Sequence, residues 1–398
     1  MKWEKVKLGN VTDSCLGKML DQNKNKGDYQ PYLANVNVRW GEFDLEDLPL
    51  MKFEESEQKR YELKYGDLVI CEGGEPGRCA IWKEQIPNMK IQKALHRVRV
   101  HDCLDYRYLF YWFLLAGKTG ELDQYFTGAT IKHMPGQKLK EVVIDKPPLE
   151  IQHRIADILS AYDDLIENNQ KQIKLLEEVA QRLYKEWFVD LRFPGHENTK
   201  IVDGVPEEWS IYPFSSKVDI MSGGTPKTSI PDYYNGKIPF YTPKDNDGAF
   251  FAYKTQMNIT EGGLKNCNSR LYPPKTVIIT ARGTVGKTTI LAVPMAMNQS
   301  CYALKMKEND APYYLFFALN NEIKALQTMA NGGVFNTIIG KTFDSINIQI
   351  PKDPLIYGFE ETVRPFMEQI KNKLQANSKL VEARDRLLPK LMSGEVKV

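Results

Sequence analysis

Residues 277–290, VIITARGTVGKTTI, and residues 69–81, VICEGGEPGRCAI, follow the same plan. In both segments an apolar strand leads into a Gly-x-x-Gly turn, a basic residue follows, and the chain becomes apolar again. With one gap, the two segments align at an offset of 209 positions. The aligned pairs are Gly283 with Gly74, Gly286 with Gly77, and Lys287 with Arg78. This self-similarity predicts that the chain contains a duplicated unit.

The similarity extends on both sides of this stretch. Trp209, Gly223 and the segment 314–317 match residues that lie 206 positions earlier. The segment 331–351 matches residues that lie 204 positions earlier. Chance would not keep the offset so nearly constant over about 150 positions, so the sequence predicts two tandem copies of one unit.

Each copy ends in a long helical run. Residues 149–188 carry apolar side chains three and four positions apart, without Gly or Pro, and Leu165 and Val179 belong to this stripe. Residues 356–392 repeat the pattern, and we expect Pro365 to kink the first turns or to mark the true start of the helix. A run of ~40 residues spans ~60 Å, which suits a coiled coil. The predicted seam comprises Ile155, Tyr162, Asn169, Leu176, Phe366, Ile370, Leu374 and Asn377.

Short strands and turns rich in Gly, Pro, Asn and Asp precede each helical run, which indicates β-rich α/β domains. Because each domain directly precedes its helix, an antiparallel pair of helices would carry the two domains at opposite ends of a rod. We therefore expect an α/β (α+β) dumbbell with a pseudo-twofold axis; the alternative is two separate helical caps. The predicted domains are 1–146 and 191–351, with spacer helices at 147–190 and 352–398.

The composition is that of an ordinary globular protein. The 398 residues are 42% hydrophobic and 26% charged, with a net charge of only +2, so a nucleic-acid-binding protein would need its positive charge on one face. The six cysteines show no C-x-x-C spacing, which indicates neither a zinc site nor a disulfide framework. The charged start MKWEKVKLGN and the lack of a long apolar run lead us to expect a cytoplasmic protein.

The letters GKTT within 277–290 raise the possibility of a phosphate-binding P-loop. That motif requires a glycine at position 281, where the chain has Ala281, and a helix after the threonine, where Pro294 and a strand-like ILAV stand instead. The five histidines form no metal-ligand spacing, and neither Pro-Pro pair fits the catalytic motif of an adenine methyltransferase. We therefore expect no catalysis, no metal and no cofactor in this chain.

Five segments resemble, in their order and spacing, the characteristic segments of the specificity subunit of type I restriction–modification enzymes. They are PPLEIQHRIADILSAYDDLI (147–166), LYKEWFVDLRF (183–193), VDGVPEEWSI (202–211), SGGTPKT (222–228) and LLPKLMSGEV (387–396). The family's recognition domains often carry a strand followed by A-R-G-x-x-G, which 277–290 is similar to. The first copy departs from this pattern in two places. It reads Glu72-Gly73-Gly74, with no arginine at the matching position, and 16–20 reads LGKML where the second copy has SGGTP.

The resemblance implies a DNA-binding function. Each recognition domain would read one half of a split DNA sequence, and the helices would set the gap between the halves. Two modification subunits, which bind S-adenosylmethionine and methylate adenine, would dock on the helices, and restriction subunits would add translocation and cleavage. The alternative is a coiled-coil scaffold without a DNA role.

Cations and amides near the glycine turns are the candidates for DNA contact. Arg282 and Lys287 flank one turn and Arg78 follows the other; such turns bring cations and free N–H groups close to phosphates or base edges. The candidates in the second copy are Arg282, Lys287, Gly283, Gly286, Thr225, Lys227, Asn336 and Thr337. Those in the first copy are Gly74, Gly77, Arg78, Lys18, Lys132 and His133.

Two asparagines interrupt the apolar stripes close to the middle of the helices. Asn169 lies at the midpoint of the first helical run, and Asn377 lies one turn after the midpoint of the second. A polar residue in a coiled-coil seam lowers stability and is best explained as fixing the register. In an antiparallel pair the midpoints meet, so we expect these two side chains to lie close together. The alternative is that both asparagines face water on the flank of the rod.

Overall fold

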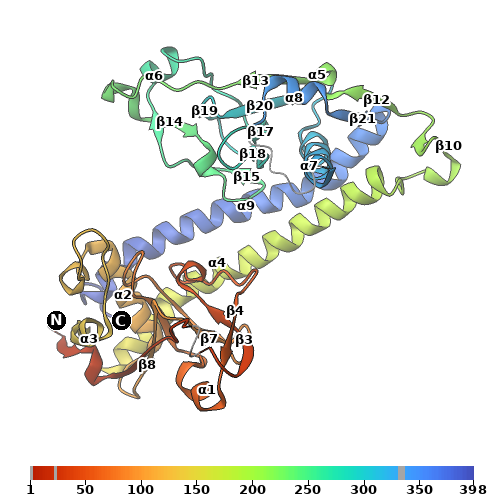
Figure 1. Ribbon diagram of the computed structural model, residues 1–398. Helices are drawn as coiled ribbons and strands as arrows, with labels where there is room; N and C mark the ends of the chain where they lie inside the picture. The colour runs from red at the N-terminus through yellow and green to blue at the C-terminus, as the bar shows by residue number, and fades with distance from the viewer. Residues whose placement is uncertain (1–2, 22–24, 330–336) are drawn as a thin grey trace. The chain divides into compact units, whose positions relative to one another are not determined.

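The computed structural model describes residues 3–21, 25–329 and 337–398 (Figure 1). It contains two compact units, Met1–Ile166 with Lys379–Val398, and Glu167–Ser378. Both long helices cross the boundary between the units, so each unit consists of one β-rich domain and a part of each helix.

Two sheets form the centre of the first unit. The four-stranded sheet has the order β2 (Thr12–Leu16), β8 (Leu95–Val100), β5 (Leu68–Cys71), β6 (Cys79–Ile81), with antiparallel neighbours. The three-stranded sheet has the order β4 (Leu50–Phe53), β3 (Asp28–Leu33), β7 (Lys90–Ile91). Strand β1 (Glu4–Lys7) pairs with β9 (Val143–Lys146), and the helices are α1 (Glu55–Tyr61), α2 (Tyr106–Thr119) and α3 (Gly136–Glu141).

The second unit repeats this arrangement, with one additional strand in its larger sheet and one additional hairpin. Its five-stranded sheet has the order β13 (Val218–Ser222), β20 (Cys301–Met306), β17 (Val277–Thr280), β18 (Thr288–Leu291), β15 (Phe251–Ala252). Its three-stranded sheet has the order β16 (Asn258–Ile259), β14 (Tyr234–Tyr241), β19 (Ala296–Met297). The remaining elements are the pair β12 (Ser210–Pro213) and β21 (Asn347–Ile350), the hairpin β10 (Ile201–Val202) and β11 (Val205–Pro206), and helices α5 (Phe214–Lys217), α6 (Glu261–Lys265), α7 (Pro312–Met329) and α8 (Gly340–Asp344).

The strand registers confirm the duplication predicted from the sequence. Every residue pair of β2 and β8 recurs in β13 and β20 exactly 206 positions later. Every pair of the hairpin β5–β6 recurs in β17–β18 at 209 positions, the offset by which the two sequence segments align. The parallel pair β3–β7 likewise recurs as β14–β19. The two copies therefore share one backbone plan.

The central strand of each copy is buried on both faces. In β5, Leu68 and Ile70 pack with α2, whereas Val69 and Cys71 belong to a cluster that includes residues of β3 and β7. Because successive side chains of a strand point to opposite faces, this continuous apolar run supplies two separate clusters. Strand β17 divides its side chains in the same way. The strands that lead into the glycine turns are thus packed on both faces.

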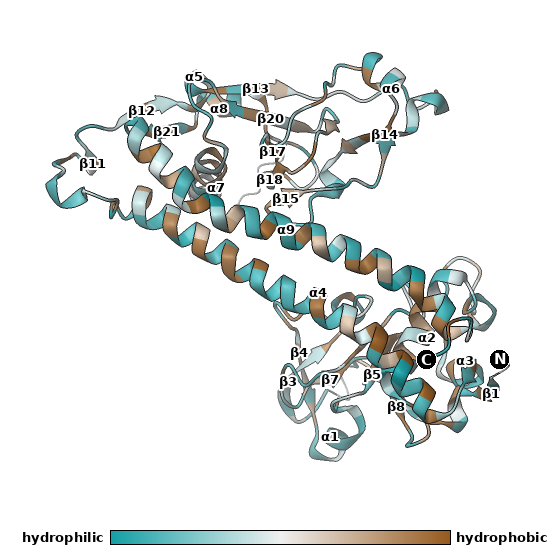
Figure 2. Cartoon of the chain, turned by 180° about the vertical axis from the view of Figure 1, so that it is seen from behind, coloured by the Kyte–Doolittle hydropathy of each residue, from teal (hydrophilic) through white to brown (hydrophobic). Residues whose placement is uncertain are grey.

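The predicted long helices are present. Helix α4 (Leu149–Tyr184) continues as a π-helical turn (Lys185–Val189), and α9 spans Asp353–Met392. Pro365 does not mark a helix start, because α9 begins twelve residues earlier and runs through it. Figure 2 shows apolar and polar residues alternating along both helices.

The two helices run antiparallel within each unit. In the second unit the rings of Tyr184 and Phe359 lie 5.9 Å apart, and in the first Arg384 donates to Asp163 over 2.5 Å. Of the seam residues predicted, Ile155 and Ile370 are fully buried, Asn169 is 8% exposed, and the others are partly buried. Leu165 and Val179, however, are 46% and 44% exposed, so their assignment to the buried stripe was wrong.

The asparagine pair is formed. Asn169 Nδ2 donates to Asn377 Oδ1 over 2.8 Å, inside the second unit, which confirms that the two side chains lie close together. This bond gives the buried amide of Asn169 a partner on the facing helix. A shift of one helix by a turn, ~5.4 Å, would break this bond and leave a largely buried amide without a partner.

Among the described residues, no helix combines the length and the apolar character needed to cross a membrane.

Candidate nucleic-acid interface

The Gly-x-x-Gly turn is the tight end of the hairpin β17–β18. Gly283 and Gly286 adopt φ values of +81° and +82°, a left-handed conformation that favours glycine. The backbone of Thr280 closes the loop, since its N–H donates to Lys287 O over 2.9 Å and its carbonyl accepts from Gly286 N over 2.9 Å. The Thr280 hydroxyl also accepts from Lys287 N over 3.0 Å. The loop is therefore held in one shape by its own hydrogen bonds.

Several predicted segments converge at the base of this hairpin. Ala281 N donates to Ser300 O over 2.7 Å, and Ile338 N donates to Ala281 O over 2.9 Å. Beside Ser300, Gln299 accepts a hydrogen bond from the hydroxyl of Thr225. The loop around 225 and the hairpin, both singled out from the sequence, thus lie together with the turn around 299.

The cations of the hairpin face solvent. Arg282 and Lys287 are exposed, as are Thr225 and Lys227 of the neighbouring loop. Thr337 is half-buried and has interactions of its own. Asn336, the remaining candidate of this copy, lies outside the described residues.

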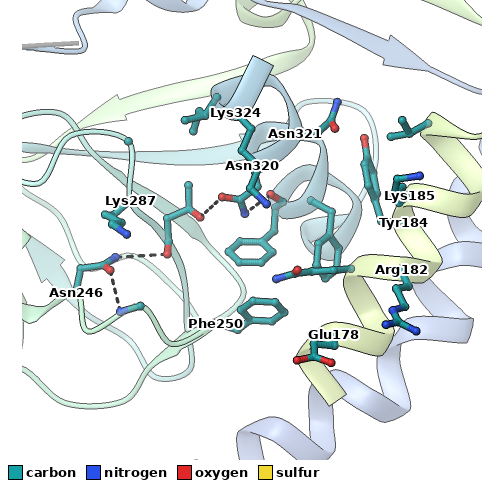
Figure 3. A pocket seen from close by; sticks show the side chains of 18 of the residues that line it. Glu178, Arg182, Tyr184, Lys185, Asn246, Phe250, Lys287, Asn320, Asn321 and Lys324 are labelled. Atoms are coloured by element: carbon teal, nitrogen blue, oxygen red, sulfur yellow. Dashed lines mark hydrogen bonds between the residues drawn. The ribbon is translucent and has the colours of Figure 1, made fainter. Parts of the chain in front are cut away.

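A cleft of about 640 Å³ opens beside the hairpin (Figure 3). Lys287 lies on the loop side, Arg182 comes from α4 and Lys185 from the π-helical turn that follows it, and Asn320 and Lys324 come from α7. Thr288 donates to Asn320 Oδ1 over 2.7 Å, which ties the strand after the loop to α7. Next to the cleft, burial raises the pKa of Glu177 to about 7, although a bond from Phe250 N over 3.4 Å opposes this change.

The first copy has the same hairpin frame with different side-chain chemistry. Gly74 and Gly77 again have positive φ values, +74° and +89°. The Arg78 guanidinium donates to Glu75 Oε2 over 3.0 Å and to Asn35 Oδ1 over 2.9 Å, and its side chain is only 16% exposed. Arg78 is thus held inside its own domain, whereas the aligned Lys287 faces solvent.

The assignment of Lys18 to DNA contact was wrong. Its side chain is 3% exposed, its ammonium lies 2.5 Å from Glu57 Oε2, and it donates to Lys52 O over 2.9 Å. A lysine in this position stabilises the domain and cannot reach a phosphate. Lys132 and His133 are exposed, with Lys132 Nζ 3.4 Å from Asp123 Oδ2.

Sequence reasoning did not find Arg182 and Lys324. Both lie on helices, far in sequence from Lys287, and only folding brings them to the same cleft. One signal was available: Lys324 aligns with Lys118 of the first copy at the offset of 206 that relates α7 to α2.

The chain matches the model of the type I restriction modification DNA specificity domain over residues 1–178 and 206–375. A specificity subunit of the type I restriction enzyme MjaIX of Methanocaldococcus jannaschii is 29% identical over 341 residues, covering 84% of this chain and 78% of that protein. The HindI specificity subunit of Haemophilus influenzae is 22% identical, covering 99% of both chains.

Among solved structures, the S subunit of a type I restriction–modification system from M. genitalium is similar over 98% of this chain and 96% of that one. The TM-score is 0.59 at 17% sequence identity, which supports a common fold.

Proposed function

Because the chain belongs to the family defined by the type I restriction modification DNA specificity domain, we propose that each of its two domains reads one half of a bipartite DNA target. The observation that carries this proposal is the repeated frame: registers are identical in the two copies, but the residues on the glycine loops differ. Two domains with the same strand arrangement but different loop residues are suited to reading two different short DNA sequences. As a specificity subunit the chain selects DNA, in the cytoplasm, and carries out no catalysis itself.

We further propose that the long helices dock two methyltransferase subunits, which supply S-adenosylmethionine chemistry, and that restriction subunits join them. Helix α4 supports this, since Leu175 and Val179 lie one turn apart on it and are 61% and 44% exposed. We infer that this exposed apolar pair belongs to the surface that binds a methyltransferase subunit.

A selection experiment tests the proposed function. The chain, together with its methyltransferase partner and S-adenosylmethionine, is mixed with a pool of randomised duplexes, and bound DNA is sequenced. We expect two short motifs separated by a fixed gap. A scaffold protein would select no sequence, and an NTPase would show binding that depends on added nucleotide; either result would contradict the proposal.

Arg282→Ala should weaken DNA binding by the complex. If Arg282 contacts a base, the loss is ~1–3 kcal/mol and specificity relaxes at one position; if it contacts a phosphate, all sequences weaken equally. Arg282→Lys is the matched variant, because it keeps the positive charge but loses the bidentate hydrogen bonding of the guanidinium group. Affinity and consensus that remain at wild-type values in Arg282→Ala would show that the loop faces away from DNA.

Replacing both Asn169 and Asn377 with leucine should loosen the helix register without lowering stability. Two apolar side chains can replace the amide pair, but they no longer penalise a slipped alignment. A one-turn slip of ~5.4 Å exceeds one base-pair step of ~3.4 Å, so selected targets should show more than one gap length. The idea is wrong if the double variant keeps a single gap and a single folded form.

A further inference from the structure

The two copies differ in the segment that approaches the central strand. In the first copy α1 ends at Tyr61, two residues before Leu63. In the second copy α6 ends at Lys265, seven residues before Tyr272, which corresponds to Leu63 at the offset of 209 and makes the equivalent backbone hydrogen bond. The second copy therefore has an irregular segment, 266–271, where the first copy has the end of a helix.

A glycine makes room for this segment. Gly224 N donates to Met297 O over 3.1 Å. The equivalent bond of the first copy is made by Lys18, whose side chain is 3% exposed and reaches Glu57. A Cβ on Gly224 would lie 2.7 Å from Asn268 N and 2.9 Å from Asn268 Cβ. In the second copy Asn268 thus occupies the space into which a side chain at position 224 would point.

Hydrogen bonds hold the segment in place. Ser269 Oγ accepts from Met297 N over 3.1 Å, and the Tyr272 hydroxyl donates to Ser222 O over 2.9 Å. Burial raises the pKa of Tyr272, and the guanidinium of Arg270 beside its hydroxyl opposes that change. Arg270 therefore lies close to the loop that contains Ser222.

The side chains that this arrangement presents to solvent are polar. Asn268 and Arg270 are exposed, and so are Thr225 and Gln299, which are hydrogen-bonded to each other. Gln299 belongs to the turn whose backbone is bonded to the base of the hairpin β17–β18. A chain of contacts thus joins the glycine hairpin, the loop around Thr225 and the segment 266–271.

We propose that Asn268 and Arg270 contact base edges of the second half-site and are specificity-determining residues of the second domain. The inference deepens the proposed function and rests on it. Asparagine can form two hydrogen bonds with adenine and arginine two with guanine, and the fixed backbone of the segment holds both side chains next to the candidate interface. In the first copy Tyr61 corresponds to Arg270 and is buried, so each half-site is read with a different set of residues.

The test is sequence selection by the chain in complex with its methyltransferase subunits and S-adenosylmethionine. At one position of the second half-site, Asn268→Ala should reduce a base preference of ~5–150-fold to none. Arg270→Lys keeps the charge but loses the bidentate donor, so it should relax a second position of the same half-site. The motif of the first half-site should stay as in the wild type, and it reports folding and assembly in every variant.

Lys265→Ala is the matched control. Lys265 is exposed at the end of α6, five residues before Arg270, so the variant removes a cation near the segment without removing either proposed contact. Both motifs should remain unchanged.

Asn268→Asp gives a readout that a structural role would not produce. It keeps the shape of the side chain but replaces the amide donor with a carboxylate oxygen, which can accept from cytosine N4. The base selected at that position should change from adenine toward cytosine.

The outcomes are separable. A wild-type consensus in both Asn268→Ala and Arg270→Lys would overturn the proposal while leaving bipartite recognition intact. An equal loss of affinity for all sequences would also overturn it, because contacts to the DNA backbone carry no sequence information. Absence of sequence selection by the wild-type complex would instead contradict the proposed function itself.

Discussion

Replacing residues 1–145 with the corresponding segment of a related specificity subunit is expected to change one half of the DNA target and to leave the other half unchanged. The segment carries the hairpin β5–β6 and its surrounding loops, and it ends within β9, before α4 begins. Three mismatched base pairs at ~1.4 kcal/mol each amount to ~10³-fold in affinity, so the old half-site should be rejected strongly.

The design must preserve the contacts between the domain and the helices. Tyr111 of α2 donates to Asp163 of α4 over 2.6 Å, and α2 packs in one cluster with Leu159 and Leu391. A donor segment that keeps these α2 side chains should dock without repacking. The reciprocal exchange of 191–351 is the control, and it should change the other half. If both halves change in either chimaera, or neither does, the domains do not read DNA independently.

Glu360→Ala is expected to destabilise the second unit severely. Glu360 is 4% exposed, and its Oε1 accepts from Tyr313 N and Tyr314 N, each over 2.8 Å. Both N–H groups lie in the first turn of α7, where the helix backbone offers them no acceptor. Ala311, the residue before the helix, has no polar side chain that could cap them. Leaving a buried donor without a partner costs ~1–3 kcal/mol, and here two donors are affected. Urea unfolding of the chain measures the loss.

The first copy supplies the rescue. Its helix α2 begins after Asp105, whose carboxylate accepts from Arg107 N over 2.7 Å and from Tyr108 N over 3.2 Å. Asp105 aligns with Ala311, and Ala156 aligns with Glu360. The first copy thus caps its helix from the residue before it, and the second caps the equivalent helix from α9. Adding Ala311→Asp to Glu360→Ala should recover most of the lost stability; unfolding curves that do not respond to either change would contradict this account.

The same carboxylate should make stability depend on pH. Burial raises the pKa of Glu360 from 4.5 to about 7, against the opposing effect of its two backbone hydrogen bonds. Between these values the folded state binds more protons than the unfolded state, so this contribution is full below pH ~4.5 and is lost as the pH rises to ~7. Glu177, whose pKa is also raised to about 7, titrates in the same window. Glu360→Gln with Glu177→Gln should therefore flatten the pH profile.

The strands and helices could be predicted from the sequence because the same pattern of residues occurs in both copies. An offset of 209 between two glycine turns recurred as the register of two hairpins, and the helical stripes recurred as α4 and α9. Counting to the middle of each helix predicted that Asn169 and Asn377 lie close together, and the structure joins them by a hydrogen bond. The periodicity and the repeat can both be read from the sequence alone, without knowledge of tertiary contacts.

The side-chain environment was less predictable. Nothing near Lys18 in sequence indicates that Glu57, thirty-nine positions later, will bury its charge, and nothing near Arg78 indicates its bond to Asn35. The cleft cations were missed for the same reason, since Arg182 and Lys324 meet Lys287 only in the folded chain. Charge on a loop is visible in a sequence, but the partner that neutralises it is not.

The division of both helices between the units has a consequence for synthesis. The second unit, Glu167–Ser378, is a continuous stretch, whereas the first needs Lys379–Val398, including Leu388, Leu391 and Met392 of its core. Domains usually fold in the order in which they leave the ribosome, at ~5–20 residues per second. Here the amino-terminal domain must wait for about 240 further residues, ~12–50 s, before the last part of its core is made. The nascent chain therefore completes its second half first, and a chain that stops early loses the integrity of its beginning rather than of its end.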